Sequence, residues 1–228
     1  MSKLIVSILS LFFFFSAFAQ EDINQLNAQG ERVGMWKKYH ANKRIRYQGQ
    51  FENGKEVGVF KFYSIVSSDN PILIKTFSSR GREAQVKFFS EKGVLESEGK
   101  MIGKERIGKW VYYKKGKQIV AEELYENGKL SGEYKIFYPN GKLTELSHFK
   151  DGKLHGNSKR YSDAGVLLDD LMYVNGEIHG EAVYYDGSGK VRQKGLYESD
   201  LKVGVWEFYT DGQLSKSMEV KSVPIKGD

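Results

Sequence analysis

The sequence of 228 residues contains no cysteine and only three prolines. Without cysteine the chain forms no disulfide, no thiolate metal site and no cysteine nucleophile. The residues that are abundant are 25 glycines, 14 tyrosines and 14 phenylalanines. Glycine favours tight turns and aromatic residues favour strands, so this mixture indicates many short strands joined by tight turns. With 40% apolar and 28% charged residues, the chain is apolar enough to fold.

The signatures of common enzymes are also missing. The sequence has no H-E-x-x-H, no G-x-S-x-G and no Walker-type loop. The glycine-rich stretch 187–190 leads toward a strand, whereas a phosphate-binding loop leads into a helix. His155 and His179 occupy the same repeat position, but two imidazoles are too few for a typical metal site. We predict no catalytic residues, no metal, no cofactor and therefore no enzyme activity.

Two acidic pairs, Glu122-Glu123 and Asp169-Asp170, are candidates for general acid–base chemistry. Consecutive side chains of a strand point to opposite faces of the sheet. We therefore expect each pair to be split between the two faces and solvated, which does not suit proton transfer.

The first nineteen residues have the features of a secretory signal peptide. Lys3 supplies the positive charge, residues 4–15 are almost entirely apolar, and Ala17-Phe18-Ala19 is a small-residue cleavage site. An uncleaved membrane anchor is the alternative, but the apolar run is short for a span of about 20 residues. We predict cleavage after Ala19, export to the periplasm or the medium, and a single mature domain of residues 20–228.

An internal repeat covers most of that domain. Glycines recur every 24 residues, with one longer gap that Ala84 fills, and the fifth residue after each repeat start is always aromatic. The repeats start near 34, 58, 84, 108, 132, 156, 180 and 204. The glycines are Gly34, Gly58, Gly108, Gly132, Gly156, Gly180 and Gly204, and the aromatics are Tyr39, Tyr63, Phe89, Tyr113, Phe137, Tyr161, Tyr185 and Tyr209.

A second column of large apolar residues repeats in step with the first. It consists of Phe51, Phe77, Met101, Tyr125, Phe149, Tyr173 and Tyr197. Both columns contain a single step of 26 residues, which predicts a two-residue insertion near "SIVSSDNPI". Each unit thus holds two strands.

Turn signals separate these strands. They include Asn140-Gly141, Lys115-Gly116 and Asp211-Gly212 within units, and Asn53-Gly54, Asn127-Gly128, Asp151-Gly152 and Asn175-Gly176 between units. Such dipeptides favour two-residue hairpin turns. We predict an all-β fold: an elongated single-sheet meander of tandem antiparallel hairpins, with about sixteen strands over about 75 Å.

The period of two along a strand assigns the repeat positions to faces. Positions two and four after the repeat start share one face and are mostly aromatic or apolar, while position three is usually lysine and position five points the other way. The residues considered as a candidate binding surface are Trp36, Trp110, Trp206, Tyr112 and Tyr184. One interpretation is that the aromatic rows hold a single-layer sheet together. The other is that one row is exposed and binds a ligand.

The units resemble MORN repeats in the variant form found in bacteria. The resemblance rests on stretches such as "YENGKLSGEYKIFYPNGKL" and "YVNGEIHGEAVYYDGSGKV" and extends from about residue 29 to 218. The segment around 64–84 is longer, and Ser158 and Ala182 stand where a large aromatic is usual. The resemblance implies an open hairpin solenoid with a binding or scaffolding role. Bacterial relatives are often labelled antitoxin-like, a label at odds with export.

Three hypotheses for the partner follow. The first is a protein, bound along the sheet. The second is an envelope polysaccharide, which requires solvent-exposed Trp36, Trp110 or Trp206. The third is an anionic lipid surface, because a pI near 9.1 with lysines on one face attracts anionic head groups. Export makes nucleic acid an unsuitable partner.

Overall fold

The computed structural model describes residues 22–78 and 82–224 of the chain. The predicted signal peptide, residues 1–19, lies outside this part. The described residues contain no helix, and their strands form one open sheet. No helix in these ranges is therefore long and apolar enough to cross a membrane.

The sheet contains seventeen strands, one more than the sequence predicts. They are β1 (Gln25–Leu26), β2 (Arg32–Tyr39), β3 (Ile45–Glu52), β4 (Lys55–Phe62), β5 (Leu73–Phe77), β6 (Glu83–Phe89), β7 (Leu95–Ile102), β8 (Glu105–Lys114), β9 (Gln118–Glu126), β10 (Lys129–Phe137), β11 (Leu143–Lys150), β12 (Lys153–Tyr161), β13 (Leu167–Val174), β14 (Glu177–Tyr185), β15 (Val191–Glu198), β16 (Leu201–Thr210) and β17 (Gln213–Pro224).

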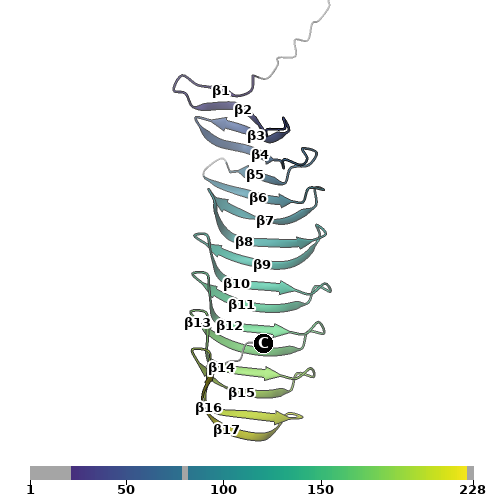
Figure 1. Cartoon of the computed structure of the whole chain (residues 1–228), viewed down its shortest axis with the longest axis vertical. Coiled ribbons are helices and arrows are strands. Elements are labelled where there is room, and N and C mark those ends of the chain that lie inside the picture. Colours follow the sequence, from purple (N-terminus) through teal and green to yellow (C-terminus); the bar gives the residue numbers. More distant parts are fainter. Residues whose placement is uncertain (1–21, 79–81, 225–228) are drawn as a thin grey trace, which may run out of the picture.

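The strands follow one another in sequence order as an antiparallel meander. Each strand pairs with the strand before it and the strand after it. They are stacked along the long axis of the molecule from β1 at one end to β17 at the other (Figure 1). Every predicted repeat start lies in or at the beginning of an even-numbered strand. The all-β meander of tandem hairpins is therefore confirmed.

The turns between units have the predicted two-residue form. Both central residues have positive φ angles at Asn53-Gly54, Asn127-Gly128, Asp151-Gly152 and Asn175-Gly176. Turns within units are of two kinds. Lys115-Gly116 and Asp211-Gly212 have the same two-residue form. At Asn140-Gly141 only the glycine has a positive φ, because the loop is longer and closes with hydrogen bonds between Tyr138 and Lys142. The two-residue prediction is wrong at this turn.

The repeat glycines lie at irregularities in the strand pairing. Between β7 and β8, for example, two consecutive pairs of facing residues enclose unequal lengths of chain. One residue, Gly99, lies between them on β7, and three residues, Gly108, Lys109 and Trp110, lie between them on β8. Gly108 has a φ of +60°, a backbone angle that residues other than glycine and asparagine rarely adopt. At Ala84, which replaces the repeat glycine, β5 and β6 pair without any such shift. The repeat therefore contains alanine where no extra residues need to be accommodated.

Backbone hydrogen bonds connect each unit to the next at the turns. The N–H of Gly128 donates to the carbonyl of Arg106 at 3.1 Å, and that of Gly152 donates to the carbonyl of Leu130 at 2.8 Å. Equivalent bonds join Gly54 to Arg32, Gly176 to Leu154 and Asp200 to Ile178. Because these bonds recur at five of the turns between units, they hold those turns in register, as expected of an array whose units are stabilised by their neighbours.

The sheet has two unlike faces. We call the face bearing positions two and four and the second column the packed face, and the face bearing positions three and five the mixed face. The buried apolar residues lie on the packed face in three clusters, one of which joins Trp36, Phe51 and Phe60. The aromatic rings there meet edge to face, as do those of Phe51 and Phe60 at 5.2 Å between centroids. This face is the core of the single-layer sheet.

The amino-terminal end of the sheet is capped by residues 22–26. β1 pairs with the outer edge of β2, and the side chain of Asn24 accepts a hydrogen bond from the N–H of Lys37 at 2.9 Å. These contacts satisfy edge groups that would otherwise be open to another strand. At the other end, the segment "VKSVPIKGD" continues β17 as far as Pro224, and residues 225–228 lie outside the described part.

Candidate functional site

The three tryptophans lie in the packed face. The exposed fraction of the residue is 8% for Trp36 and 0% for both Trp110 and Trp206. The indole N–H of Trp110 donates to the carbonyl of Lys100 at 3.1 Å, and that of Trp206 donates to the carbonyl of Leu196 at 3.2 Å. The polysaccharide hypothesis requires exposed indoles, so its structural requirement is not met. These residues instead pack the sheet.

Tyr112 and Tyr184 lie on the same face and are partly buried. Tyr112 accepts a hydrogen bond from Arg106 at 2.6 Å and donates one to Glu123. Burial, followed by the hydrogen bond to Glu123, raises the pKa of Tyr112 well above its usual range. The hydroxyls of Tyr184 and Tyr197 are 3.2 Å apart. The structure thus brings Tyr112 near Trp110 and Tyr184 near Trp206, but their hydroxyl groups are engaged within the face.

A polar group of residues interrupts the packed face, which the sequence did not indicate. Glu145, Arg160 and Asp169 are direct cross-strand partners on β11, β12 and β13. Arg160 binds the Asp169 carboxylate with its Nε at 2.8 Å and with Nη2 at 2.6 Å. The side chain of Ser147 donates to Glu145 at 2.6 Å. The signal for this group was the departure from the repeat at Ser158, which stands beside it at a position where a large aromatic is usual.

The acidic pairs are split between the two faces, as predicted. Asp169 lies on the packed face, whereas Asp170 binds Lys159 on the mixed face at 3.2 Å. The expectation that both carboxylates are solvated is wrong for Asp169, which is only 3% exposed. Since one face of this sheet is a core, a carboxylate that points to it must be buried and therefore paired.

The mixed face carries the lysines and the fifth-position aromatics. None of these eight aromatics is buried, and Tyr39 is 51% exposed. From β6 onward, lysines pair with carboxylates directly across the strands: Lys87 with Glu98, Lys159 with Asp170 and Lys194 with Glu207. Tyrosines join these pairs, as in the hydrogen bond of 2.7 Å from Tyr113 to Glu98. This part of the face is therefore not the lysine-rich cationic surface that the sequence suggested.

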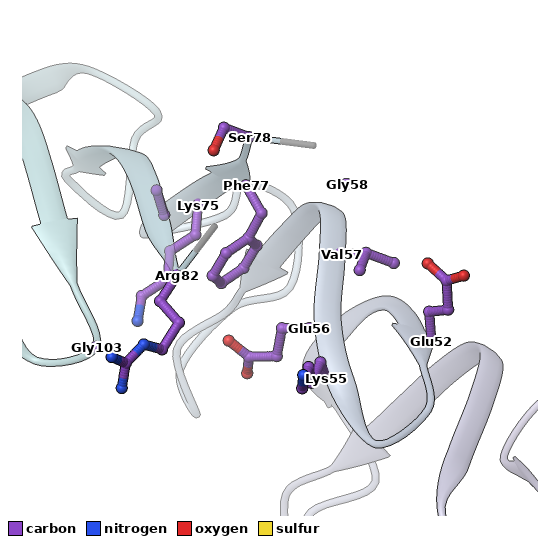
Figure 2. A pocket seen from close by; sticks show the side chains of 11 residues that line it. Glu52, Lys55, Glu56, Val57, Gly58, Lys75, Phe77, Ser78, Arg82 and Gly103 are labelled. Atoms are coloured by element: carbon purple, nitrogen blue, oxygen red, sulfur yellow. The ribbon is translucent and has the colours of Figure 1, made fainter. Parts of the chain in front are cut away.

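A hollow of about 900 Å³ lies beside β4, β5 and β6 (Figure 2). The ring of Phe77 lies in its middle, between Glu56 and Lys55 on one side and Lys75 and Arg82 on the other (Figure 2). Phe77 also packs edge to face against Phe60 of the core. The rim therefore carries both charges, and nothing about it selects one kind of ligand.

The metal-binding possibilities are limited. Within residues 22–78 and 82–224, no group of three or more His, Asp or Glu residues could hold a metal ion. His155 Nδ1 lies 3.5 Å from the backbone N–H of Asn175, which occupies one of its two nitrogens. The two repeat histidines thus give no further reason to expect a metal.

The comparisons with known proteins concern single units of the array. The family model for the MORN repeat variant matches residues 32–53, 130–151 and 178–199. Each match covers one hairpin and the turn that follows it, namely β2–β3, β10–β11 and β14–β15. No curated protein matches the chain. Repeats of this family generally bind proteins or membrane lipids. Because the family model and the hairpin array agree, the chain contains repeats of the MORN variant type.

Proposed function

We propose that this chain is an exported, non-catalytic scaffold that binds a protein partner along the mixed face of its sheet. The observation that carries the proposal is the position of the fifth-position aromatics. All eight units have an aromatic residue there, and none of the eight is buried. The core is made by other positions on the opposite face. Packing of the core therefore does not account for the aromatic column.

The geometry of the column suits protein recognition. Successive units are two strands apart, so the aromatics recur about every 10 Å along the sheet. Tyrosine provides a large contact area with few rotatable bonds, which is why it is enriched in protein interfaces. From β6 onward, lysines between the aromatics are already paired with carboxylates across strands, as in Lys194–Glu207 at 3.0 Å. A partner bound to this part of the face would therefore meet a nearly neutral surface ordered by hydrogen bonds.

Export is part of this proposal, and an antitoxin-like role is the alternative to it. Export rests on the predicted signal peptide of residues 1–19 and places the partner in the periplasm or outside the cell. A conventional antitoxin binds its toxin in the cytoplasm, so export favours a different protein partner. The experiment below distinguishes these cases through the identity and compartment of the captured protein.

The experiment is a capture assay with the mature chain, residues 20–228, on an envelope fraction and on a cytoplasmic fraction. In one variant, the adjacent column residues Tyr161 and Tyr185 are replaced by serine. In the control variant both become phenylalanine, which keeps the rings. We expect an envelope protein that is retained by the phenylalanine variant and lost from the serine variant.

Both variants must unfold at temperatures close to that of the parent chain for the comparison to hold. Retention of the same protein by a folded serine variant would contradict binding through the column. Specific capture of a cytoplasmic protein alone, combined with a precursor that is not processed in cells, would contradict export and favour the antitoxin-like role.

A further inference from the structure

Each tryptophan of the packed face has a basic side chain over its ring, and that side chain comes from four residues earlier in the same strand. The distances from the guanidinium carbon or the ammonium nitrogen to the ring centroid are 5.0 Å for Arg32 over Trp36, 4.4 Å for Arg106 over Trp110 and 3.8 Å for Lys202 over Trp206. The face of an aromatic ring attracts a cation, most strongly where water is excluded. The cation at Trp206 is the nearest of the three.

Two further aromatic rings surround this cation site. Tyr197 meets the Trp206 ring edge to face at 5.2 Å between centroids, and Tyr184 is tilted toward it at 6.4 Å. The hydroxyls of Tyr184 and Tyr197 are 3.2 Å apart, which holds the two tyrosines together. Tyr197 is also the direct cross-strand partner of Lys202, so both side chains leave the sheet at the same place. These residues form a cage of aromatic rings that contains a cation.

Lys202 is held less firmly in its cage than Arg106 is held over its own tryptophan. Arg106 donates to the hydroxyls of Tyr112 at 2.6 Å and Tyr125 at 3.0 Å, and it lies 3.8 Å from the carboxylate of Glu123. Among the residues that the structure describes, Lys202 takes part in no ion pair. A ligand that competes for the ring can therefore displace Lys202 more easily than Arg106.

The surroundings of Lys202 also favour a different kind of cation. Burial, followed by the charge of Arg192, lowers the pKa of Lys202, because the cage disfavours a charged primary ammonium. A primary ammonium is strongly hydrated and loses much of that hydration when it lies against a ring. A methylated ammonium keeps the positive charge, has less hydration to lose and presents apolar methyl groups to the rings. It suits the cage better than the lysine does.

We propose that Trp206, Tyr197 and Tyr184 form a binding site for quaternary ammonium groups, and that Lys202 occupies this site until a ligand displaces it. Two sources carry the same chemistry, namely small solutes such as choline and the trimethylated lysine of a peptide. Since Trp206 is fully buried, a ligand reaches its ring only after Lys202 has moved away. The site lies on the packed face, so it is independent of the partner surface on the mixed face.

The test follows the indole N–H signals of the three tryptophans by NMR while choline chloride is added to the mature chain, with sodium chloride as the reference. The variant Trp206→Phe identifies the signal of Trp206. We expect choline to shift that signal and to leave the signal of Trp110 unchanged, because Arg106 stays in place there. Dimethylbutanol, the uncharged carbon analogue of choline, should bind at least about tenfold more weakly.

Two outcomes of this titration would overturn the proposal without the use of any lysine variant. If dimethylbutanol bound as tightly as choline, the site would recognise apolar groups and not a cation. If the Trp206 signal did not respond to choline or to a peptide that contains trimethyllysine, the cage would serve only to pack the sheet. The ligand that binds more tightly, choline or this peptide, shows whether the source is a solute or a protein side chain.

Changes at Lys202 test whether the lysine competes with the ligand. Lys202→Ala should tighten choline binding about tenfold, because the competing cation is gone from the ring. Lys202→Met leaves an uncharged chain over the ring, so its choline binding should be weaker than that of Lys202→Ala. Lys216→Ala is the control, since Lys216 is an exposed lysine of the neighbouring strand, and its affinity should match that of the parent chain. Unchanged affinity in a folded Lys202→Ala chain would overturn the competition.

Discussion

The indole ring of Trp110 lies directly on the backbone of Gly99 in the neighbouring strand. Its N–H donates to the carbonyl of the next residue, Lys100, at 3.1 Å. The same relationship joins Trp206 to Gly195 and its neighbour Leu196, and Phe60 covers Gly49 in the same way. In each case the three residues that begin at a repeat glycine face a single glycine of the preceding strand. The shift in register thus creates a place for a large ring inside a single-layer sheet.

The first prediction concerns this glycine. A Cβ atom at position 99 would overlap the ring of Trp110, so Gly99→Ala should lower the free energy of unfolding by about 1 to 3 kcal/mol. Gly187→Ala is the control, because position 187 has no atom within 4 Å of the added Cβ and no positive φ. That change should have an effect within about 0.5 kcal/mol or be slightly stabilising. Urea unfolding measures both, and equal effects would contradict the contact.

The second prediction compares two repeat glycines. Gly108 has a φ of +60°, which asparagine tolerates, whereas Gly156 has a φ of +102°, which lies outside the left-handed region that asparagine adopts. Gly156→Asn should therefore cost about 1 to 3 kcal/mol, and Gly108→Asn clearly less. Thermal unfolding of the two variants provides the measurement. A larger loss for the change at 108 would show that backbone conformation is not the limiting factor.

The third prediction concerns tryptophan fluorescence. Since all three indoles are buried, emission of the folded chain should be blue-shifted and weakly quenched by acrylamide. Envelope polysaccharide should not change it. Unfolding in guanidinium should move the emission to longer wavelength, which provides the internal reference. A change on adding polysaccharide to the folded chain would revive the polysaccharide hypothesis.

The fourth prediction tests the column on the mixed face. Phe137 is only partly buried, whereas Trp206 is fully buried in the core. Phe137→Ala should therefore cost about 1 to 2 kcal/mol and Trp206→Ala about 3 to 5 kcal/mol. Denaturant unfolding measures both losses, and the slope of the unfolding free energy against denaturant concentration should be the same in both variants. If Phe137→Ala were as costly as Trp206→Ala, the fifth-position column would be structural, and the main reason for assigning it to a partner would disappear.

The fifth prediction concerns pH. The hydrogen bond from Tyr113, helped by Lys87, lowers the pKa of Glu98, while burial and the bond to Glu98 raise the pKa of Tyr113 to about 12. A lowered carboxylate pKa stabilises the folded chain above the ordinary value of 4.5, and this contribution is lost as pH falls through the folded pKa. The tyrosine contribution is complete below pH 10 and is lost as pH rises through about 12.

The variant Tyr113→Phe separates these contributions. It should move the pKa of Glu98 back toward its ordinary value, as followed by NMR titration of the side-chain carboxyl. The loss of stability on acidification should become smaller at the same time. Lys104→Gln serves as a control on an exposed turn lysine that forms no ion pair among the described residues. An unchanged Glu98 pKa in Tyr113→Phe would contradict the hydrogen bond.

The sequence by itself determined the number of units, the turns between units and the two faces of the sheet. The reason is that these features depend on local chemistry: glycine and asparagine tolerate positive φ, and side chains alternate along a strand. The same reasoning placed Asp169 and Asp170 on opposite faces. The resemblance of the units to MORN repeats was visible in the sequence as well.

Only the tertiary structure decided which aromatic residues are buried and which charges are paired. From the sequence, the tryptophans could have been exposed residues that bind a ligand or buried residues of the core. Their burial depends on the register shifts that set Trp110 over Gly99 and Trp206 over Gly195. Neutralisation of Lys87 by Glu98 and of Lys159 by Asp170 likewise depends on which residues face each other across strands. A period of 24 residues does not specify these pairs, because burial and ion pairing depend on cross-strand neighbours that are distant in the sequence.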